Sequence, residues 1–120
     1  MKNTPQEIEQ GMIEKNIELQ RGIEEVPELI NKKAGSERDY EVSLAQKTLA
    51  LKTEGYPATI IRDLAKGNKT IADLKFKHSV ATELLKLQYI KIDAAKTKIG
   101  SYQSMHALRR IEYQKANIVD

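Results

Sequence analysis

Apolar and small residues recur at alternating spacings of three and four between Ile71 and Asn117, the last long segment of the chain. Because this spacing lasts for five heptads, it is typical of a coiled-coil-like helix with one continuous apolar face. At about 1.5 Å per residue such a helix is roughly 70 Å long, whereas a compact globule of this chain length has a radius of gyration of about 13–14 Å. We therefore expect an all-α, elongated, coiled-coil-like bundle rather than a globule. The positions on this face, called the seam below, are Ile71, Leu74, His78, Ala81, Leu85, Gln88, Ile92, Ala95, Ile99, Tyr102 and His106.

The first half of the chain predicts two further helical segments. Thr4 followed by Pro5 and, three residues after Thr4, Glu7 has the spacing of a capping box, so an N-terminal helical segment is expected over residues 4–34. Pro27 either interrupts this segment or begins the next one, because proline cannot donate a helical hydrogen bond. Ser36 after a weak Ala-Gly pair predicts the start of a firmer helix over residues 36–54.

Residues 55–69 predict a structured tip between two antiparallel helices. Gly55-Tyr56-Pro57 ends the preceding helix, and a short helix is expected over residues 58–66, closed by Gly67-Asn68. Asn68 or Thr70 then caps the long helix, expected over residues 70–117. Gly100 either kinks that helix or ends it. We treat the whole chain, residues 1–120, as a single helical domain in the form of an antiparallel hairpin.

Charge is distributed unevenly along the chain. Residues 1–60 carry 11 acidic and 8 basic side chains, a net charge of −3, whereas residues 61–120 carry 6 acidic and 12 basic side chains, a net charge of +6. This asymmetry indicates a basic surface for an anionic partner. The alternative is a lysine-rich helix face that pairs with the acidic half of the same or a neighbouring chain.

No pattern predicts catalysis. The chain has no cysteine, so disulfides, thiolate metal sites and thiol catalysis are excluded. His78 and His106 would lie about 42 Å apart on one straight helix, too far to share a metal ion. Since phosphate-loop, nucleophile-elbow and zinc-binding spacings are also missing, we expect no enzyme, no metal, no cofactor and no small-molecule substrate. Apolar runs are too short to cross a membrane and no signal peptide is visible, so a cytoplasmic protein is expected.

Basic side chains gather near aromatic ones at two places. Cationic grooves with stacking platforms bind single-stranded nucleic acid, so both places are candidate nucleic-acid sites. The alternative is that Tyr56 packs on the end of the hairpin and the cations are only solvated. The candidate residues are Tyr56, Arg62, Lys66, Lys69, Lys75 and Lys77 around the tip, and Arg109 and Arg110 near Tyr113.

The seam also predicts assembly of several copies. Polar Gln88 and the two histidines at core-type positions cost stability but fix register and oligomeric state. We therefore expect a homo-oligomer. The residues expected at the oligomer seam are Leu74, His78, Leu85, Ile92, Ile99 and Tyr102.

The stretch from Tyr40 to Tyr113 resembles small helical proteins of the recombination and replication modules of tailed phages. It contains YEVSLAQKTLALKTEG, the tip YPATIIRDLAKGNK and the segment IGSYQSMHALRRIEYQ. In its layout of a long helix, a late glycine and a final helical segment, the chain is also similar to the UvsY-type recombination mediators of T-even phages. This resemblance implies a ring-forming oligomer that binds single-stranded DNA and helps to load a recombinase.

Two functional hypotheses follow. The first is a non-enzymatic, oligomeric accessory protein of phage DNA recombination or replication, acting in the host cytoplasm on single-stranded DNA, a recombination protein, or both. The second is a protein-interaction module, such as an inhibitor of a host nuclease or defence factor, or an assembly or scaffolding protein.

Overall fold

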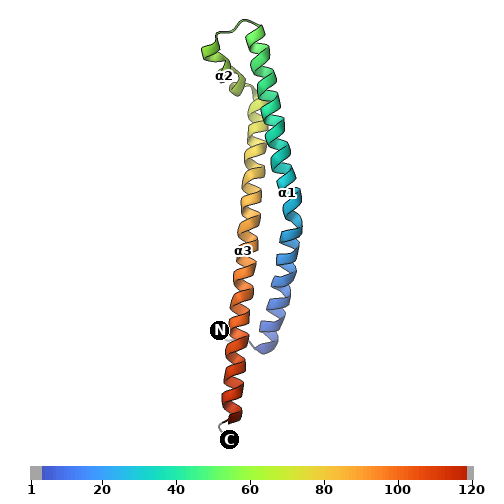
Figure 1. Cartoon of the computed structure of the whole chain (residues 1–120), viewed down its shortest axis with the longest axis vertical. Coiled ribbons are helices and arrows are strands. Elements are labelled where there is room, and N and C mark those ends of the chain that lie inside the picture. Colours follow the sequence, from blue (N-terminus) through green and yellow to red (C-terminus); the bar gives the residue numbers. More distant parts are fainter. Residues whose placement is uncertain (1–3, 119–120) are drawn as a thin grey trace. The chain divides into compact units, whose positions relative to one another are not determined.

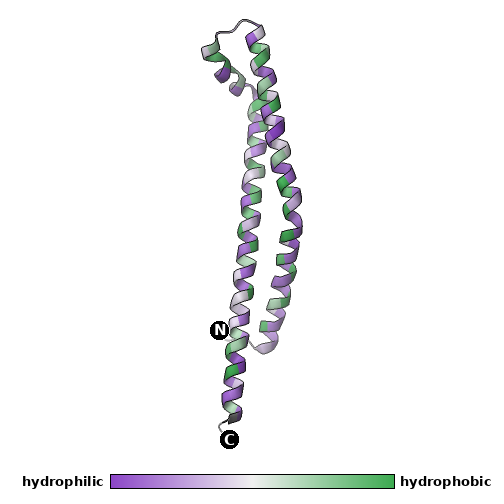
Figure 2. Cartoon of the chain, viewed as in Figure 1, coloured by the Kyte–Doolittle hydropathy of each residue, from purple (hydrophilic) through white to green (hydrophobic). Residues whose placement is uncertain are grey.

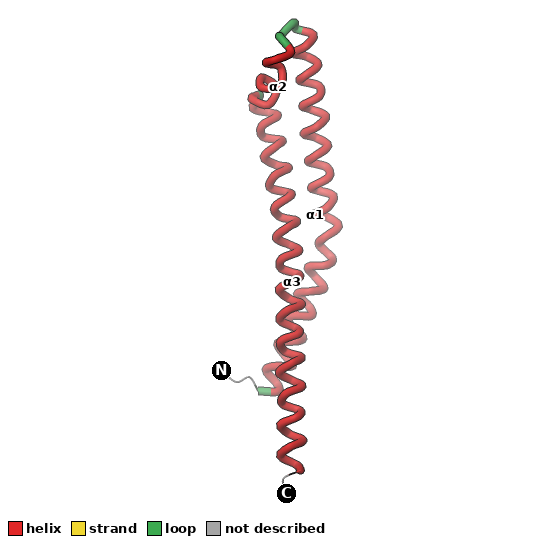
Figure 3. Tube along the Cα trace, turned by 60° about the vertical axis from the view of Figure 1, so that its left-hand side comes forward, coloured by secondary structure: helices red, strands yellow, loops and turns green. Residues whose placement is uncertain are grey.

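The computed structural model describes residues 4–118, which form three helices: α1 (Pro5–Thr53), α2 (Ala58–Gly67) and α3 (Lys69–Ile118) (Figure 1). These residues contain no strand, so the expected all-α class is confirmed. A short loop joins α1 to α2 (Figure 3). Contacts within the chain divide it into two units. Of the described residues, 4–25 and 88–118 belong to the first unit, and the second unit is Val26–Leu87.

The capping box predicted at the start of α1 is present. The Thr4 hydroxyl accepts a hydrogen bond from the Glu7 amide at 3.1 Å, and the Thr4 amide donates to the Glu7 carboxylate at 3.3 Å. Each residue thus satisfies one backbone amide that has no partner inside the helix.

The interruption expected between residues 34 and 36 is absent, because α1 continues through Pro27 and Gly35 to Thr53. Ser36 does not cap a new helix. Its hydroxyl instead donates to the Lys33 carbonyl at 2.9 Å, a bond that a serine inside a helix commonly makes. Ser36 is also buried, and its oxygen lies 3.4 Å from Nδ1 of His78 on α3. A contact between helices therefore holds the segment in the helical conformation that its sequence favours only weakly.

A Schellman motif ends α1 as the glycine at position 55 predicts. The Tyr56 amide donates to the Leu51 carbonyl at 3.2 Å and the Gly55 amide donates to the Lys52 carbonyl at 3.1 Å. Gly55 has a φ of 90°, which a residue with a Cβ atom rarely adopts. The chain can then turn sharply into α2.

The short helix at the tip is confirmed, with α2 ending one residue later than predicted. Asn68 caps the following helix, since its side-chain oxygen accepts a hydrogen bond from the Ile71 amide at 3.3 Å. Gly100 does not end α3, which passes through it to Ile118.

The second unit has its core where α2 returns beside the other helices. Leu51 of α1 and Ile61 and Ala65 of α2 are buried together, and Leu44 packs against them. Because Ile61 and Ala65 are four residues apart, they share one face of α2. Nearer the middle of α1, Ser36 lies against His78 of α3. The segments of α1 and α3 in this unit run antiparallel, as expected.

The first unit contains two close approaches between its helices. The side-chain amide of Gln88 donates to the Gly22 carbonyl at 2.9 Å and to the Glu25 carboxylate at 3.2 Å. A Cβ atom on Gly22 would lie only 3.1 Å from Ile92, and one on Gly11 would overlap the ring of Tyr102. Glycines at these two positions therefore let antiparallel segments of α1 and α3 lie close together.

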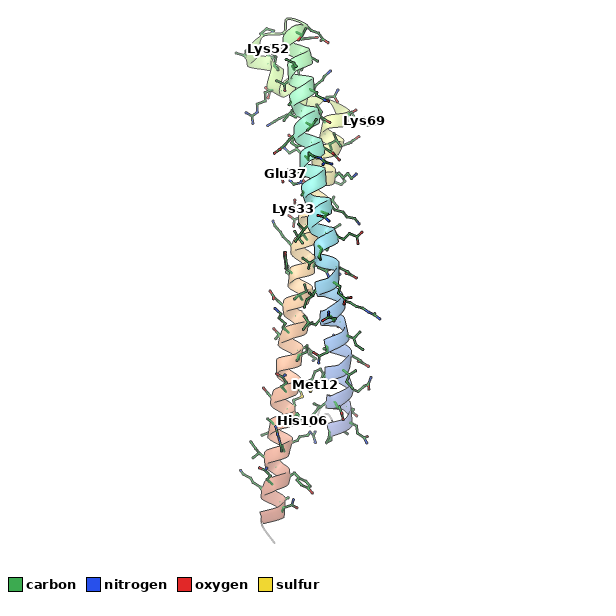
Figure 4. The ribbon with its side chains drawn as sticks, turned by 45° about the vertical axis from the view of Figure 1, so that its right-hand side comes forward. Met12, Lys33, Glu37, Lys52, Lys69 and His106 are labelled. Atoms are coloured by element: carbon green, nitrogen blue, oxygen red, sulfur yellow. The ribbon has the colours of Figure 1, made fainter. Side chains whose placement is uncertain are left out.

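The predicted seam agrees closely with the burial of α3. Every seam position from Ile71 to Tyr102 is buried or half-buried. His106 is the exception: it is exposed on α3 (Figure 4). The next turns of α3 are still partly covered, because Met105 and Arg109 are half-buried and Ile8 of α1 is fully buried. After Tyr102 the covered positions therefore depart by one residue from the predicted seam.

Polar and apolar residues interleave along all three helices (Figure 2). Among the described residues, no helix has a stretch that is both long and apolar enough to cross a membrane. The ion pairs formed by these residues all lie within α1 or within α3. One of them, between Lys15 and Glu18, raises the pKa of Lys15 through its hydrogen bond and through coulombic attraction. The described residues thus form no ion pair between the acidic first half and the basic second half.

We predict opposite consequences for alanine at two glycines of α1. Gly35→Ala should stabilise the protein by about 0.5–1 kcal/mol, because alanine favours the helix and the new methyl group meets no atom within 4 Å. Gly22→Ala makes the same substitution at the close approach to α3. Its stability should rise less than that of Gly35→Ala, or fall, because the new methyl group would crowd Ile92 and Gln88. Urea unfolding monitored by circular dichroism measures both. Equal gains would contradict the close approach at Gly22.

A second prediction concerns Gln88, which is buried. Gln88→Glu should destabilise the protein by about 2 kcal/mol or more at pH 7, because a buried carboxylate would face the Gly22 carbonyl and the Glu25 carboxylate. Gln88→Leu should cost less, about 1 kcal/mol, since it buries no charge. The anion is the unfavourable form of the new carboxyl, so the defect of Gln88→Glu should shrink as the pH falls towards 4. A defect independent of pH would contradict this account.

Candidate nucleic-acid interface

Two of the predicted cations line one groove of about 290 Å³ in the second unit. Lys66 comes from the last turn of α2 and Lys75 from the beginning of α3. Helical spacing places Lys75 on the same side of α3 as Ile71 and Ser79, four residues before and after it. Tyr40 of α1 closes the groove. Its lining is Tyr40, Lys66, Ile71, Ala72, Lys75, Phe76 and Ser79.

The groove combines an apolar floor with exposed charge. Ile71 is 3% exposed, whereas Phe76 is 71% exposed and Lys75 is also exposed. Lys66 is half-buried. Within residues 4–118, neither lysine forms an ion pair. Both ammonium groups are thus available to an anionic ligand, next to an aromatic surface that water covers.

Other predicted residues around the tip do not line this groove. Tyr56 lies in the loop after α1 and is 44% exposed, so its ring is not packed away. Arg62 is exposed on α2, and Lys69 is exposed at the start of α3 (Figure 4). Lys77 lines a different, mainly apolar groove of about 390 Å³ with residues such as Leu29 and Leu84. The structure therefore brings together part of the predicted set.

Arg109 and Arg110 belong to the first unit. Arg109 is half-buried and Arg110 is exposed, and Tyr113 nearby is 69% exposed. They remain a separate basic set.

The six residues predicted at an oligomer seam all contribute to the buried or half-buried face of α3. Three of them meet α1 of the same chain within their unit: His78 lies at Ser36, Ile92 at Gly22 and Tyr102 at Gly11. Their role between copies of the chain stays a prediction.

Sequence reasoning missed Tyr40 and Phe76 as site residues. A signal for Phe76 exists, because it is the only phenylalanine, lies off the seam and stands between Lys75 and Lys77. Tyr40 gave no such signal, since its place beside Lys66 depends on the return of α2.

The described residues contain no cluster of three or more histidine, cysteine or acidic side chains that could hold a metal ion. The groove offers two lysine cations, two aromatic rings and two hydroxyls, a set that can hold an anionic, aromatic ligand. Comparison with protein-family models, curated proteins and solved structures found no match.

Proposed function

We propose that this protein is a non-enzymatic accessory protein of phage DNA recombination or replication that binds single-stranded DNA. The observation that carries the proposal is the groove that Lys66 and Lys75, which form no ion pair within residues 4–118, line together with the exposed ring of Phe76. Phosphate groups attract the lysines, and bases stack on aromatic rings without regard to sequence.

The surroundings of the groove add positive charge. Arg62 and Lys69 are exposed nearby in sequence, and Lys77 follows Phe76 directly. Exposed cations on the same segments raise the local concentration of a polyanion and speed its association. Tyr56 supplies a further exposed ring on the loop before α2. Arg109 and Arg110 of the first unit are proposed as a separate contact with single-stranded DNA.

The link to recombination comes from the resemblance to small phage proteins of that module. It includes the proposals that the protein forms a homo-oligomer, that it contacts a recombination protein, and that it works in the host cytoplasm. Binding of one long strand by several copies would add avidity without any new contact.

We predict that the wild-type protein binds a fluorescein-labelled oligothymidine at low salt, measured by fluorescence anisotropy. Because binding releases counterions, the logarithm of the affinity should fall linearly with the logarithm of the salt concentration, by about 0.7 for each phosphate contacted. Lys75→Ala should weaken binding and reduce that slope by about 0.7.

Lys96→Ala is the matched control, since it removes the same charge from an exposed position of α3 in the first unit. It should change the slope less than Lys75→Ala. Absence of wild-type binding at low salt would refute the proposed function.

A second candidate function, a protein-interaction module, is favoured by an apolar row on α3. Phe76, Val80, Leu84 and Leu87 follow each other at helical spacing and are 71%, 39%, 47% and 44% exposed. Rows of exposed apolar side chains mark surfaces that bind a protein partner. A nuclease inhibitor or scaffolding protein would present such a surface.

For this candidate we predict that the tagged protein recovers one stoichiometric host protein, identified by mass spectrometry. Leu84→Asp should abolish recovery, because a charge would be buried in the interface. Leu49→Asp, at an exposed position of α1, should not. Recovery of nucleic acid alone would count against this candidate.

A further inference from the structure

Phe76 is placed unusually for an aromatic residue in a chain with so few of them. It is the only phenylalanine, the chain has no tryptophan, and yet 71% of its surface is in contact with water. Burial of such a ring against the seam would stabilise the fold. The fold instead presents it beside two cations, which indicates a use outside the core.

The groove next to Phe76 has the size and lining of a site for one flat ring. Its volume of about 290 Å³ lies at the small end of the range for ligand sites, which begins at about 300 Å³. Ile71 provides an apolar floor and Tyr40 a second aromatic wall. The Ser79 hydroxyl donates its hydrogen to the Lys75 carbonyl at 3.0 Å, so its lone pairs can accept a hydrogen bond from a ligand.

We propose that this groove is a stacking site for a single unpaired nucleobase, held on the ring of Phe76. Lys66 and Lys75 bind the phosphates on either side of that base. This assignment rests on the proposed function and adds to it a defined subsite, with Phe76 as its central residue.

The site distinguishes single strands from duplexes. In a duplex the faces of each base are covered by its neighbours, and only the base edges are presented in the grooves. In a single strand a base can leave the stack and place its face on an aromatic ring. A groove of this volume has room for one base.

The test uses Phe76→Trp as its reporter. Because the chain has no tryptophan, the new indole is the only one in the protein. Titration with oligothymidine should quench its fluorescence with the same midpoint as the anisotropy change, whereas a blunt duplex of equal length should not. The matched control is Leu49→Trp, at another exposed site of the second unit, where the same titration should leave the fluorescence unchanged.

A second measurement compares the affinities of position-76 variants for oligothymidine by fluorescence anisotropy. Phe76→Leu keeps an apolar side chain but loses the aromatic face, so the affinity for oligothymidine should fall about tenfold, with an unchanged salt slope. Phe76→Trp keeps an aromatic face and should bind oligothymidine with about the affinity of the wild type. Since residue 76 is mostly exposed, circular dichroism should show both variants folded.

Two results would overturn the assignment in different ways. If Phe76→Leu binds oligothymidine as tightly as the wild type and the indole at position 76 is not quenched, the stacking site is wrong although the protein still binds DNA. If the wild type binds neither single strand nor duplex at low salt, the proposed function fails and the stacking site fails with it.

Discussion

Burial of one face of α3 against α1 is the interaction on which both units depend. Apolar burial supplies most of its energy, but the face also contains Gln88 and His78, and polar groups removed from water must find partners. They do so across the helix pair: Gln88 reaches Gly22 and Glu25, and His78 reaches Ser36. Among the described residues, every buried side-chain nitrogen or oxygen has a hydrogen-bond partner. These bonds specify which residues of α1 lie opposite which residues of α3, a choice that leucine and isoleucine alone leave open.

The same burial determines what α3 presents to water. Once the seam faces α1, residues such as Phe76 must point elsewhere, because helical periodicity leaves them no other direction. The Gly55 and Asn68 caps then set the path of α2, which brings Lys66 to the beginning of α3. The candidate site therefore depends on two local cap motifs, which place α2, and on the helical periodicity of α3, which turns Phe76 away from the seam. None of its side chains needs a strained backbone, since Gly55 alone among the described residues has a positive φ.

Much of the fold could be predicted because its signals are local. The Thr4 box, the Gly55 stop and the seam each depend on residues within a few turns of one another. The expected break at Ser36 was wrong because a tertiary contact with His78 competes with the capping tendency of serine. His106 fits the seam spacing in sequence, but the half-buried positions of α3 after Tyr102 are Met105, Ala107 and Arg109. The groove could not be predicted as a unit, since Tyr40, Lys66 and Phe76 come from three helices and no periodicity relates them.

The Ser36 contact has a consequence for the histidine it touches. The only hydrogen on the Ser36 oxygen is donated to the Lys33 carbonyl, so towards His78 that oxygen acts as an acceptor. Nδ1 of the imidazole must then carry the hydrogen, and the neutral ring is confined to one of its two tautomers. In that tautomer the other ring nitrogen, Nε2, carries no hydrogen and is the acceptor of the neutral imidazole.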